Sequence, residues 1–565
     1  EYKKYAWSGL LCIGVEVVLE ITVPLLMADL IDYGVTNADG TYIIKKGLQM
    51  ALCAVLALIL GVGSAKFSAL AGQGLGANIR KAEYEKLQSY SFSNIDHFSV
   101  SSLVTRLTSD VTNIQNAVST GMRPFGRSPV MLIFATSFAF RINSTLALVF
   151  LVALPTLAVL LILIIINVGP LYGRMQSAID QVNRCIQENL TAIRVVKSYV
   201  RGDYEVEKFG VVNENLKSES EKAFGTAVLN MPAMQFVMYG TILGILLIGG
   251  RLINEGQMMI GQLTSFLSYV LLILNSLMMM SNVFLLMTRS LASAERIMEV
   301  IDEKIDITDE NAKDIAVAKG EIEFDHVWFK YKDTAKEYVL SDVSFHIKPG
   351  QTVGIIGQTG SSKTTLVQLI PRLYDVTKGE VKIDGINVKE YPVRHLRDAV
   401  AMVLQKNTLF SGSLIGNLHW GNENATLDEI KEACQIACVD EFVDRLADGY
   451  DTEMGQEGVN VSGGQKQRIC IARAILKKPK VLILDDSTSA VDTATEAKIR
   501  SGLAEKLPDM TKIIIAQRIS SVRHADQIII MDRGHVEAIG THESLLRDNQ
   551  IYQEIYASQK EGADL

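Results

Sequence analysis

Two groups of residues suited to phosphate chemistry lie about twenty residues apart, in the stretch 461–492. The first is a small-residue turn that opens a predicted helix over 466–478, made of Ser462, Gly463, Gly464 and Gln465. The second is a carboxylate pair, Asp485 and Asp486, at the end of an apolar strand predicted over 481–484. Unpaired N–H groups at a helix start suit an anionic phosphate, and paired carboxylates suit Mg²⁺ and an attacking water. Together with a glycine-rich loop upstream, they predict a nucleoside triphosphate site.

The glycine-rich loop lies between a strand predicted over 352–356 and a helix that begins near Lys363. It contains Gly357, Gln358, Thr359, Gly360, Ser361, Ser362, Lys363, Thr364 and Thr365. This context fits a Walker A loop, in which N–H groups cradle the phosphates, Lys363 reaches the β and γ phosphates, and Thr364 ligates Mg²⁺. Ser362 stands where a glycine usually precedes the lysine, and its side chain crowds the phosphate approach. The loop is thus a phosphate binder in type, while its strength stays open.

The elements that must position these residues indicate an α/β domain. From Glu321 onward, short β-rich runs at 322–329, 343–347, 352–356 and 380–383 alternate with helical stretches. The stretch around 302–319 is charged and marks a boundary. We therefore predict a first domain over 1–302, a linker over 303–319 and a P-loop ATPase domain with a helical subdomain over 320–565.

The first three hundred residues hold most of the apolar excess behind the 48% hydrophobic content and the mean hydropathy of +0.20. Six segments approach or exceed the ~20 residues that a membrane-spanning helix needs: 6–31, 48–72, 118–140, 144–168, 228–253 and 260–288. Lys and Arg in the long polar runs 73–117 and 169–226 place both runs, and both termini, in the cytoplasm. Apolar residues at helical spacing in these runs predict that the membrane helices continue beyond the bilayer as a stalk.

The charge balance excludes one class of protein. A net charge of −8 and a pI near 5.7 argue against a nucleic-acid binder, which usually carries a basic face. The six cysteines show no disulfide framework, and Cys434 and Cys438 lack the further ligands that a metal site needs.

With these motifs, essentially all 565 residues resemble an ABC transporter, specifically an exporter half-transporter with one six-helix membrane domain and one nucleotide-binding domain. The resemblance implies ATP and Mg²⁺ as cofactors. It implies that Tyr331 stacks on adenine, that Gln405 lies at the nucleotide and metal and links them to the membrane domain, and that Asp485 is the Walker B aspartate. It also implies that Ser462–Gln465 is the signature, that Asp492 ends the D-loop 489–492, and that Phe98–Asp110 is a first coupling region.

Besides Ser362, two further residues depart from the pattern of that family. Asp486 stands where a glutamate normally acts as general base, and Gln517 stands where a switch histidine normally touches the γ-phosphate. A base must come within roughly 3 Å of its proton, and a side chain one methylene shorter falls back by about 1 Å. An amide can hydrogen-bond the phosphate but cannot carry a proton. We interpret the site as one that holds ATP rather than hydrolysing it. The alternatives are that aspartate serves as a competent base and that the changes are simple drift.

The resemblance implies that two nucleotide domains dimerise head to tail, each site combining one chain's Walker residues with the other's signature. An altered Walker side with an intact signature predicts a heterodimer with a different half-transporter that carries the consensus site. Two readings from other classes stay open: an ATP-binding regulator or channel-type subunit without pumping, and a DNA-repair ATPase, which the membrane segments nearly exclude. An importer is disfavoured because its membrane and ATPase parts are usually separate chains.

Substrate identity rests on less. Glu16 and Glu20 share one helix face within the first apolar segment, and intramembrane ionisable residues suggest function, here a cationic amphipathic substrate. Pairing with Arg123 or Arg127, or a hydrated outer cavity, is the alternative. We expect export of hydrophobic or amphipathic compounds of the multidrug type, with lipid or peptide export as the alternative, in the plasma membrane of a bacterium and in contact with lipid.

Overall fold

The computed structural model describes residues 2–332, 334–487 and 490–561, which form two compact units. Unit 1 comprises the residues up to Gln88 together with Ser101–Asp302. Unit 2 comprises Ser89–Val100 and the residues from Glu303 onward. A short piece of the first polar run is therefore packed with elements that follow it far along the chain.

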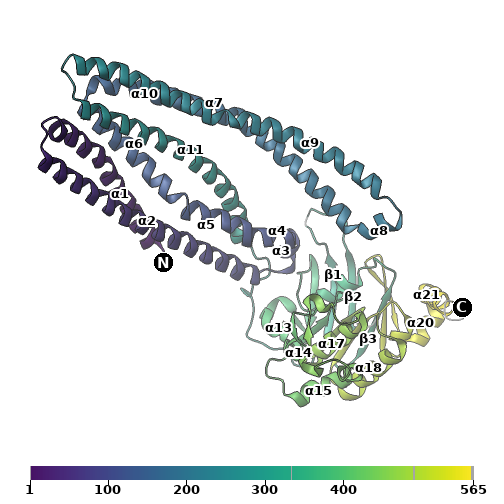
Figure 1. The fold of residues 1–565 in the computed structure, drawn as a ribbon. Helices are drawn as coiled ribbons and strands as arrows, with labels where there is room; N and C mark the ends of the chain where they lie inside the picture. Colours follow the sequence, from purple (N-terminus) through teal and green to yellow (C-terminus); the bar gives the residue numbers. More distant parts are fainter. Residues whose placement is uncertain (1, 333, 488–489, 562–565) are drawn as a thin grey trace. The chain divides into compact units, whose positions relative to one another are not determined.

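Unit 1 is built of long helices (Figure 1). Its helices are α1 (Lys3–Asp29), α2 (Gly40–Gln88), α4 (Val100–Thr105), α5 (Val111–Ser119), α6 (Met122–Ile142), α7 (Ser144–Thr191), α8 (Ile193–Ser198), α9 (Gly202–Val228), α10 (Asn230–Asn254) and α11 (Ile260–Asp302), with π-helical turns η1 (Leu30–Val35) and η2 (Arg106–Asp110). The 49-residue α2 and the 48-residue α7 are much longer than the ~20 residues that cross a bilayer. The polar runs after the second and fourth apolar segments thus continue as helix, as their apolar spacing predicts.

Four stretches of the described residues are long and apolar enough to span a membrane: Lys3–Val35, Gly40–Gln88, Gly202–Asn254 and Ile260–Met280. The sequence predicts six. Helix α6 carries Arg123, Arg127 and Arg141, which lower its hydropathy, and α7 contributes only the shorter apolar stretch Ser144–Leu160. The predicted segment 144–168 also includes residues 161, 164 and 165, whose side chains lie outside the described residues. The count of six stays a prediction.

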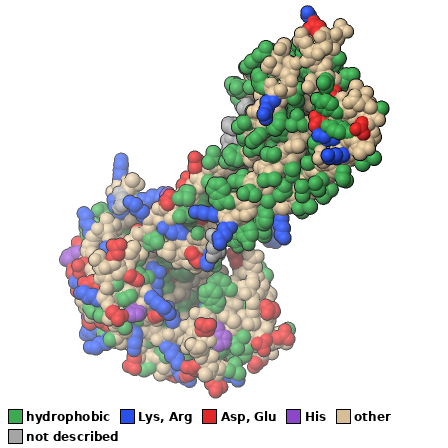
Figure 2. All heavy atoms as spheres, turned by 90° about the vertical axis from the view of Figure 1, so that its left-hand side faces the viewer, with side chains coloured by type: hydrophobic (Ala, Val, Ile, Leu, Met, Phe, Trp, Pro, Cys, Tyr) green, Lys and Arg blue, Asp and Glu red, His purple; other side chains and the backbone are tan. Residues whose placement is uncertain are grey.

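Hydrophobic side chains cover the helical unit, whereas the surface of the other unit mixes charged and apolar groups (Figure 2). Leu48, Val152 and Phe236 are exposed by 72%, 71% and 80%. Such a large apolar surface is stable only against lipid or another apolar partner. The interior of the unit contains a core of Ile, Leu, Phe and Ala side chains from α1, α6, α7, α10 and α11.

Unit 2 contains a six-stranded sheet in the order β12-β11-β3-β10-β9-β6, in which only the β11–β12 pair is antiparallel. Its strands are β3 (Thr352–Gly357), β6 (Val400–Val403), β9 (Val481–Asp485), β10 (Thr511–Ile515), β11 (Gln527–Asp532) and β12 (His535–Gly540). Strands β9 and β10 are buried along their whole length, as expected for apolar runs in a parallel sheet covered on both faces.

A second, antiparallel sheet has the order β2-β1-β4-β5, with β1 (Ile322–Phe329), β2 (Leu340–Ile347), β4 (Lys378–Ile383) and β5 (Ile386–Asn387). The helices of unit 2 are α3 (Phe92–His97), α12 (Lys363–Gln368), α13 (Val393–Ala399), α14 (Leu414–His419), α15 (Leu427–Ile436), α16 (Asp440–Val443), α17 (Gly463–Leu476), α18 (Thr493–Lys506), α19 (Ile519–Val522), α20 (His542–Asp548) and α21 (Gln550–Glu561), with 3-10 turns at Val388–Glu390, Gly449–Asp451 and Gln456–Gly458 and a small ladder of β7 (Gly412–Ser413) with β8 (Glu453–Met454).

Candidate functional site

Three adjacent parallel strands bring the predicted phosphate residues to one edge of the large sheet. In this register Ile515 of β10 pairs with Ile355 of β3 on one side and with Asp485 of β9 on the other. The carboxyl ends of parallel strands share an edge, so the glycine-rich loop, Asp486 and Gln517 follow these strands at the same place.

These residues line a pocket of about 350 Å³. Its lining consists of Thr359, Gly360, Ser362, Lys363, Thr364, Thr365, Gln405, Asp485, Asp486, Ile515 and Gln517. Gly357 and Ser361 accept hydrogen bonds from the lysine of this pocket: Lys363 Nζ donates to the Gly357 carbonyl at 2.9 Å and to Ser361 Oγ at 3.2 Å. Burial lowers the pKa of Lys363, while Asp485 and Asp486 act in the opposite direction. The pocket therefore combines one desolvated cation with two carboxylates.

The donor set at Asp485 fits Mg²⁺. Thr364 Oγ1 donates to Asp485 Oδ1 at 3.1 Å, and Asp485 is 1% exposed. The other carboxylate oxygen, Oδ2, is buried without a hydrogen-bond partner among the described residues. Burial raises the pKa of Asp485, which the Thr364 hydroxyl opposes. A hard divalent cation prefers such oxygens and would satisfy the orphaned one.

Two of the departures from the family pattern, Asp486 and Gln517, lie together. Gln517 Nε2 donates to Asp486 Oδ2 at 2.9 Å. Burial raises the pKa of Asp486, and hydrogen bonds from Gln517 and Gln405 act against that rise. Asp486 has φ +48° and Ser362 has φ +70°, both in the left-handed region. Aspartate enters this region more readily than most residues, whereas the serine occupies a conformation that suits glycine.

Tyr331 lies beside the pocket with 44% of its surface exposed. Its hydroxyl shares a hydrogen bond of 2.8 Å with Thr365 Oγ1 in α12. Its ring makes edge contacts with Phe329 and Tyr374, at centroid distances of 4.9 and 5.2 Å. A half-exposed aromatic ring held in this way can stack on a nucleobase.

The signature turn is formed but does not line this pocket. Ser462 caps α17, accepting from the N–H of Gln465, whose side chain accepts from the N–H of Ser462 at 2.8 Å. Among the described lining residues, none comes from Ser462–Gln465. Asp492 caps α18 through the N–H of Thr495 at 3.0 Å, also away from the pocket, and Ser489 of the predicted D-loop lies outside the described residues. The predicted signature and the predicted Walker residues thus lie at different places in unit 2.

Glu16 and Glu20 are joined to arginines of α6. Arg123 donates to Glu16 at 2.7 Å, and Arg127 reaches Glu16 at 3.2 Å and Glu20 at 2.6 Å. Gly61 of α2 makes room for this group, because a Cβ there would lie 3.2 Å from a Glu16 oxygen. The internal pairing that the sequence leaves open is therefore present.

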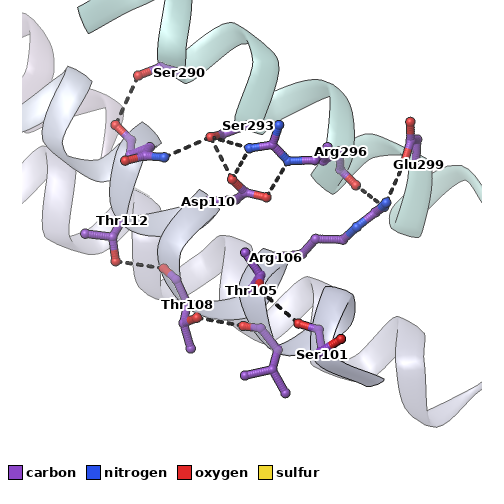
Figure 3. Close-up of polar contacts among 12 residues, drawn as sticks. Ser101, Thr105, Arg106, Thr108, Asp110, Thr112, Ser290, Ser293, Arg296 and Glu299 are labelled. Atoms are coloured by element: carbon purple, nitrogen blue, oxygen red, sulfur yellow. Dashed lines mark hydrogen bonds and ion pairs between the residues drawn. The ribbon is translucent and has the colours of Figure 1, made fainter. Parts of the chain in front are cut away.

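The structure adds polar contacts that the sequence analysis does not identify. In unit 1, Arg296 Nε donates to Asp110 Oδ2 at 2.8 Å, Ser293 donates to Asp110 Oδ1, and Arg106 reaches Glu299 at 2.7 Å (Figure 3). The arginine bond holds the pKa of Asp110 below its usual range.

The predicted coupling region 98–110 is divided between the units. In unit 2, Tyr374 donates to Asp96 of α3 at 2.6 Å. Like those of unit 1, this contact joins residues far apart in the chain, so no local pattern could have revealed it.

Comparisons with known proteins agree with this geometry. Residues 7–277 match the family model of the ABC transporter transmembrane region, and residues 340–489 match that of the ABC transporter domain. The uncharacterized ABC transporter ATP-binding protein YfiB of Bacillus subtilis is 38% identical, with 100% of this chain and 98% of that protein covered. A second B. subtilis protein, "Putative multidrug export ATP-binding/permease protein YgaD", is 31% identical over 99% of this chain and 97% of its own length.

A solved bacterial Atm1-family ABC exporter with ATP bound shares the fold, with a TM-score of 0.84 at 23% identity, over 99% of this chain and 98% of that chain. Motifs, sheet order and relatives all lead to the same family. The chain belongs to the ABC transporters, as a multi-pass exporter half-transporter in which a helical transmembrane domain is fused to one ATP-hydrolysing nucleotide-binding domain.

Proposed function

We propose that this chain is the degenerate-site subunit of a heterodimeric exporter of hydrophobic or amphipathic compounds. Its own Walker side binds ATP and Mg²⁺ and hydrolyses slowly, while its signature completes a consensus site on a different half-transporter. The observation that carries the proposal is the hydrogen bond between Asp486 and Gln517. At the position where the family has the general base, this chain has a shorter carboxylate that already accepts a bond from an amide.

The geometry argues against fast hydrolysis at this site. Asp486 is one methylene shorter than a glutamate, and a misplacement of about 1 Å can cost on the order of a hundredfold in rate. Gln517 can donate a hydrogen bond but cannot transfer a proton. Lys363, Thr364 and Asp485, by contrast, keep the arrangement that holds phosphates and Mg²⁺. These three binding residues are therefore retained, whereas the two hydrolytic residues are altered.

The signature supports the second half of the proposal. Ser462–Gln465 forms a regular capping box at the start of α17, with its N–H groups at the positive end of the helix dipole. The turn lies outside this chain's own pocket and is ready to complete a partner's site. A homodimer of this chain would have two sites, each with an intact signature and a slow Walker side. A different half-transporter with consensus Walker residues would give the pair one fast site.

The transport step follows from linkage. ATP contacts both nucleotide domains only when they are closed, and a ligand shifts an equilibrium through such differential affinity. Closure would be transmitted to the membrane domain through Gln405 and the coupling regions. Hydrolysis at the partner's site would reset the pair.

The substrate class rests on the apolar transmembrane domain and on the YgaD relative, whose name describes multidrug export. We propose six membrane-spanning helices in a bacterial plasma membrane, with both termini and the nucleotide domain on its cytoplasmic side. Glu16 and Glu20 would reach a cationic substrate only by loosening their bonds with Arg123 and Arg127.

The test is ATP turnover in lipid, measured for this chain alone and for the complex that co-purifies with it, each with and without Asp486→Glu. We expect the chain alone to be nearly inactive, and the complex to be active with little dependence on residue 486. Brisk turnover by the chain alone would overturn the asymmetric site. A complex that binds ATP but hydrolyses none would favour a regulatory or channel-type subunit.

A further inference from the structure

The side-chain amide of Gln559, in α21, makes two hydrogen bonds to the backbone of the segment that carries Gln517. Gln559 Nε2 donates to the Gln517 carbonyl at 2.8 Å, and Gln559 Oε1 accepts from the N–H of Ile519 at 2.8 Å. A side chain that both donates to and accepts from a short backbone segment restrains its position and its direction.

Gln559 is itself held by a packed helix. Tyr552 of α21 is fully buried, and its hydroxyl bonds His542 of α20 at 2.7 Å. Ile551, Ile555 and Tyr556 pack against the large core of unit 2. The amide therefore extends from a fixed helix toward the segment 517–519, in which Ile519 is also buried in this core.

The segment needs such a restraint because it joins β10 to a very short helix. Helix α19 has four residues, and its N-cap residue, Arg518, makes no side-chain cap bond. Helices of this length are marginal without tertiary support, and their first N–H groups need outside acceptors. Gln559 supplies the acceptor for Ile519 from a distant part of the chain.

We infer that Gln559 is a positioning residue that fixes the backbone of 517–519 and so directs the Gln517 side chain into the nucleotide pocket. The chain of contacts runs from Gln559 to the Gln517 carbonyl, and from the Gln517 side chain to Asp486. The inference deepens the proposed function, on which it rests only for the role of Gln517 at bound ATP.

The first test is local and independent of catalysis. In the full chain in lipid nanodiscs, Gln559→Ala is expected to speed hydrogen exchange of the Ile519 amide about threefold to tenfold, the effect of losing one hydrogen bond. The matched control is Gln553→Ala, on the same helix, because the Gln553 amide donates to the carbonyls of Leu546 and Arg547, outside the segment 517–519. Equal protection of Ile519 in the wild type and in Gln559→Ala would overturn the inference.

The second test separates positioning from simple capping. The carboxylate of Gln559→Glu can accept from Ile519 but cannot donate to the Gln517 carbonyl, and it repels that oxygen. We expect this variant to keep the protection of Ile519 and yet, like Gln559→Ala, to weaken binding of a fluorescent ATP analogue about threefold or more. Gln553→Ala should bind the analogue as the wild type does.

Unchanged binding in both Gln559 variants would reduce Gln559 to a structural cap and overturn the positioning role. If the wild-type chain bound no ATP analogue, the proposed function would fail, while the exchange comparison would still decide whether Gln559 restrains the segment.

Discussion

Gln517 donates a hydrogen bond of 2.9 Å to Asp486, so two of the residues that depart from the family pattern are direct partners. The bond engages one of the two carboxylate oxygens with which a general base would accept a proton from its water. Asp486 also lies at φ +48°, which aspartate tolerates better than glutamate does. The two substitutions therefore form one local arrangement rather than two independent changes.

We predict that the double variant Asp486→Glu, Gln517→His raises ATP turnover at this chain's own site by about tenfold to a hundredfold, because it restores both the reach of the base and a proton-carrying side chain. Phosphate release by the chain purified alone in lipid, where no consensus site contributes, measures the effect. Asp532→Glu, at the end of the neighbouring β11 and outside the pocket lining, should leave turnover unchanged. No gain in the double variant would mean that residues other than Asp486 and Gln517 limit hydrolysis at this site.

Ser362→Gly is expected to stabilise unit 2 by about 1 kcal/mol and to tighten ATP binding. Ser362 has φ +70°, and a non-glycine residue in the left-handed region is strained by about that amount. The adjacent Ser361→Gly serves as control: Ser361 is 3% exposed, and its hydroxyl accepts from Lys363 at 3.2 Å, so its loss should destabilise. Thermal unfolding of both variants decides the matter; a lower Tm for Ser362→Gly would contradict the strain argument.

The sequence predicts the two strand ends that carry the glycine-rich loop and the Asp485–Asp486 pair, because apolar runs reveal both strands. Strand β10, which precedes Gln517, is not among the predicted strands, and only the resemblance places Gln517 at the nucleotide. It also predicts the long helices of unit 1. It does not predict the bond of Arg296 to Asp110 or the bonds of the Gln559 amide, because these contacts join residues brought together only by folding. The contact of Tyr374 with Asp96 of α3, within unit 2, cannot be predicted for the same reason.

Arg127→Leu is expected to destabilise the membrane domain by up to about 3 kcal/mol, since it leaves Glu16 and Glu20 without a partner that contacts both. Glu16 is 5% exposed, so water cannot fully replace the lost charge. Thermal unfolding in detergent measures the effect. Arg141→Leu, on the same helix at an exposed position, provides the comparison. Equal Tm values for the two variants would show that the cluster contributes nothing to stability.

The stability of unit 1 should fall in acid through Asp110. The bond from Arg296 lowers the pKa of this carboxyl, so the unfolded chain takes up a proton at higher pH than the folded one. The stabilisation is complete above the ordinary carboxyl pKa of about 4 and is lost as the pH falls through the lower folded value. Asp110→Asn should lower the Tm at pH 7 and flatten its dependence on pH between 5 and 3, whereas Asp180→Asn, on an exposed turn of α7, should do neither. A slope unchanged in Asp110→Asn would assign the acid effect to other groups.

Tyr374→Phe is expected to loosen α3 within unit 2. The Tyr374 hydroxyl donates to Asp96 at 2.6 Å, and its ring contacts Phe92 at 6.1 Å. Burial and Asp96 raise the pKa of Tyr374, so the hydroxyl remains a donor at neutral pH. Losing this bond to a charged acceptor should speed hydrogen exchange of the α3 amides about tenfold.

Tyr391→Phe removes another tyrosine hydroxyl of unit 2, a fully buried one that bonds the Ile383 carbonyl at 2.9 Å away from α3, and should leave exchange in α3 unchanged. The same ring of Tyr374 lies 5.2 Å from that of Tyr331, which we propose stacks on adenine. ATP should therefore slow exchange in α3 in the wild type and do so less in Tyr374→Phe, because the hydroxyl is the polar link from this ring pair to α3. An equal effect of ATP in both proteins would separate α3 from the adenine side of the pocket.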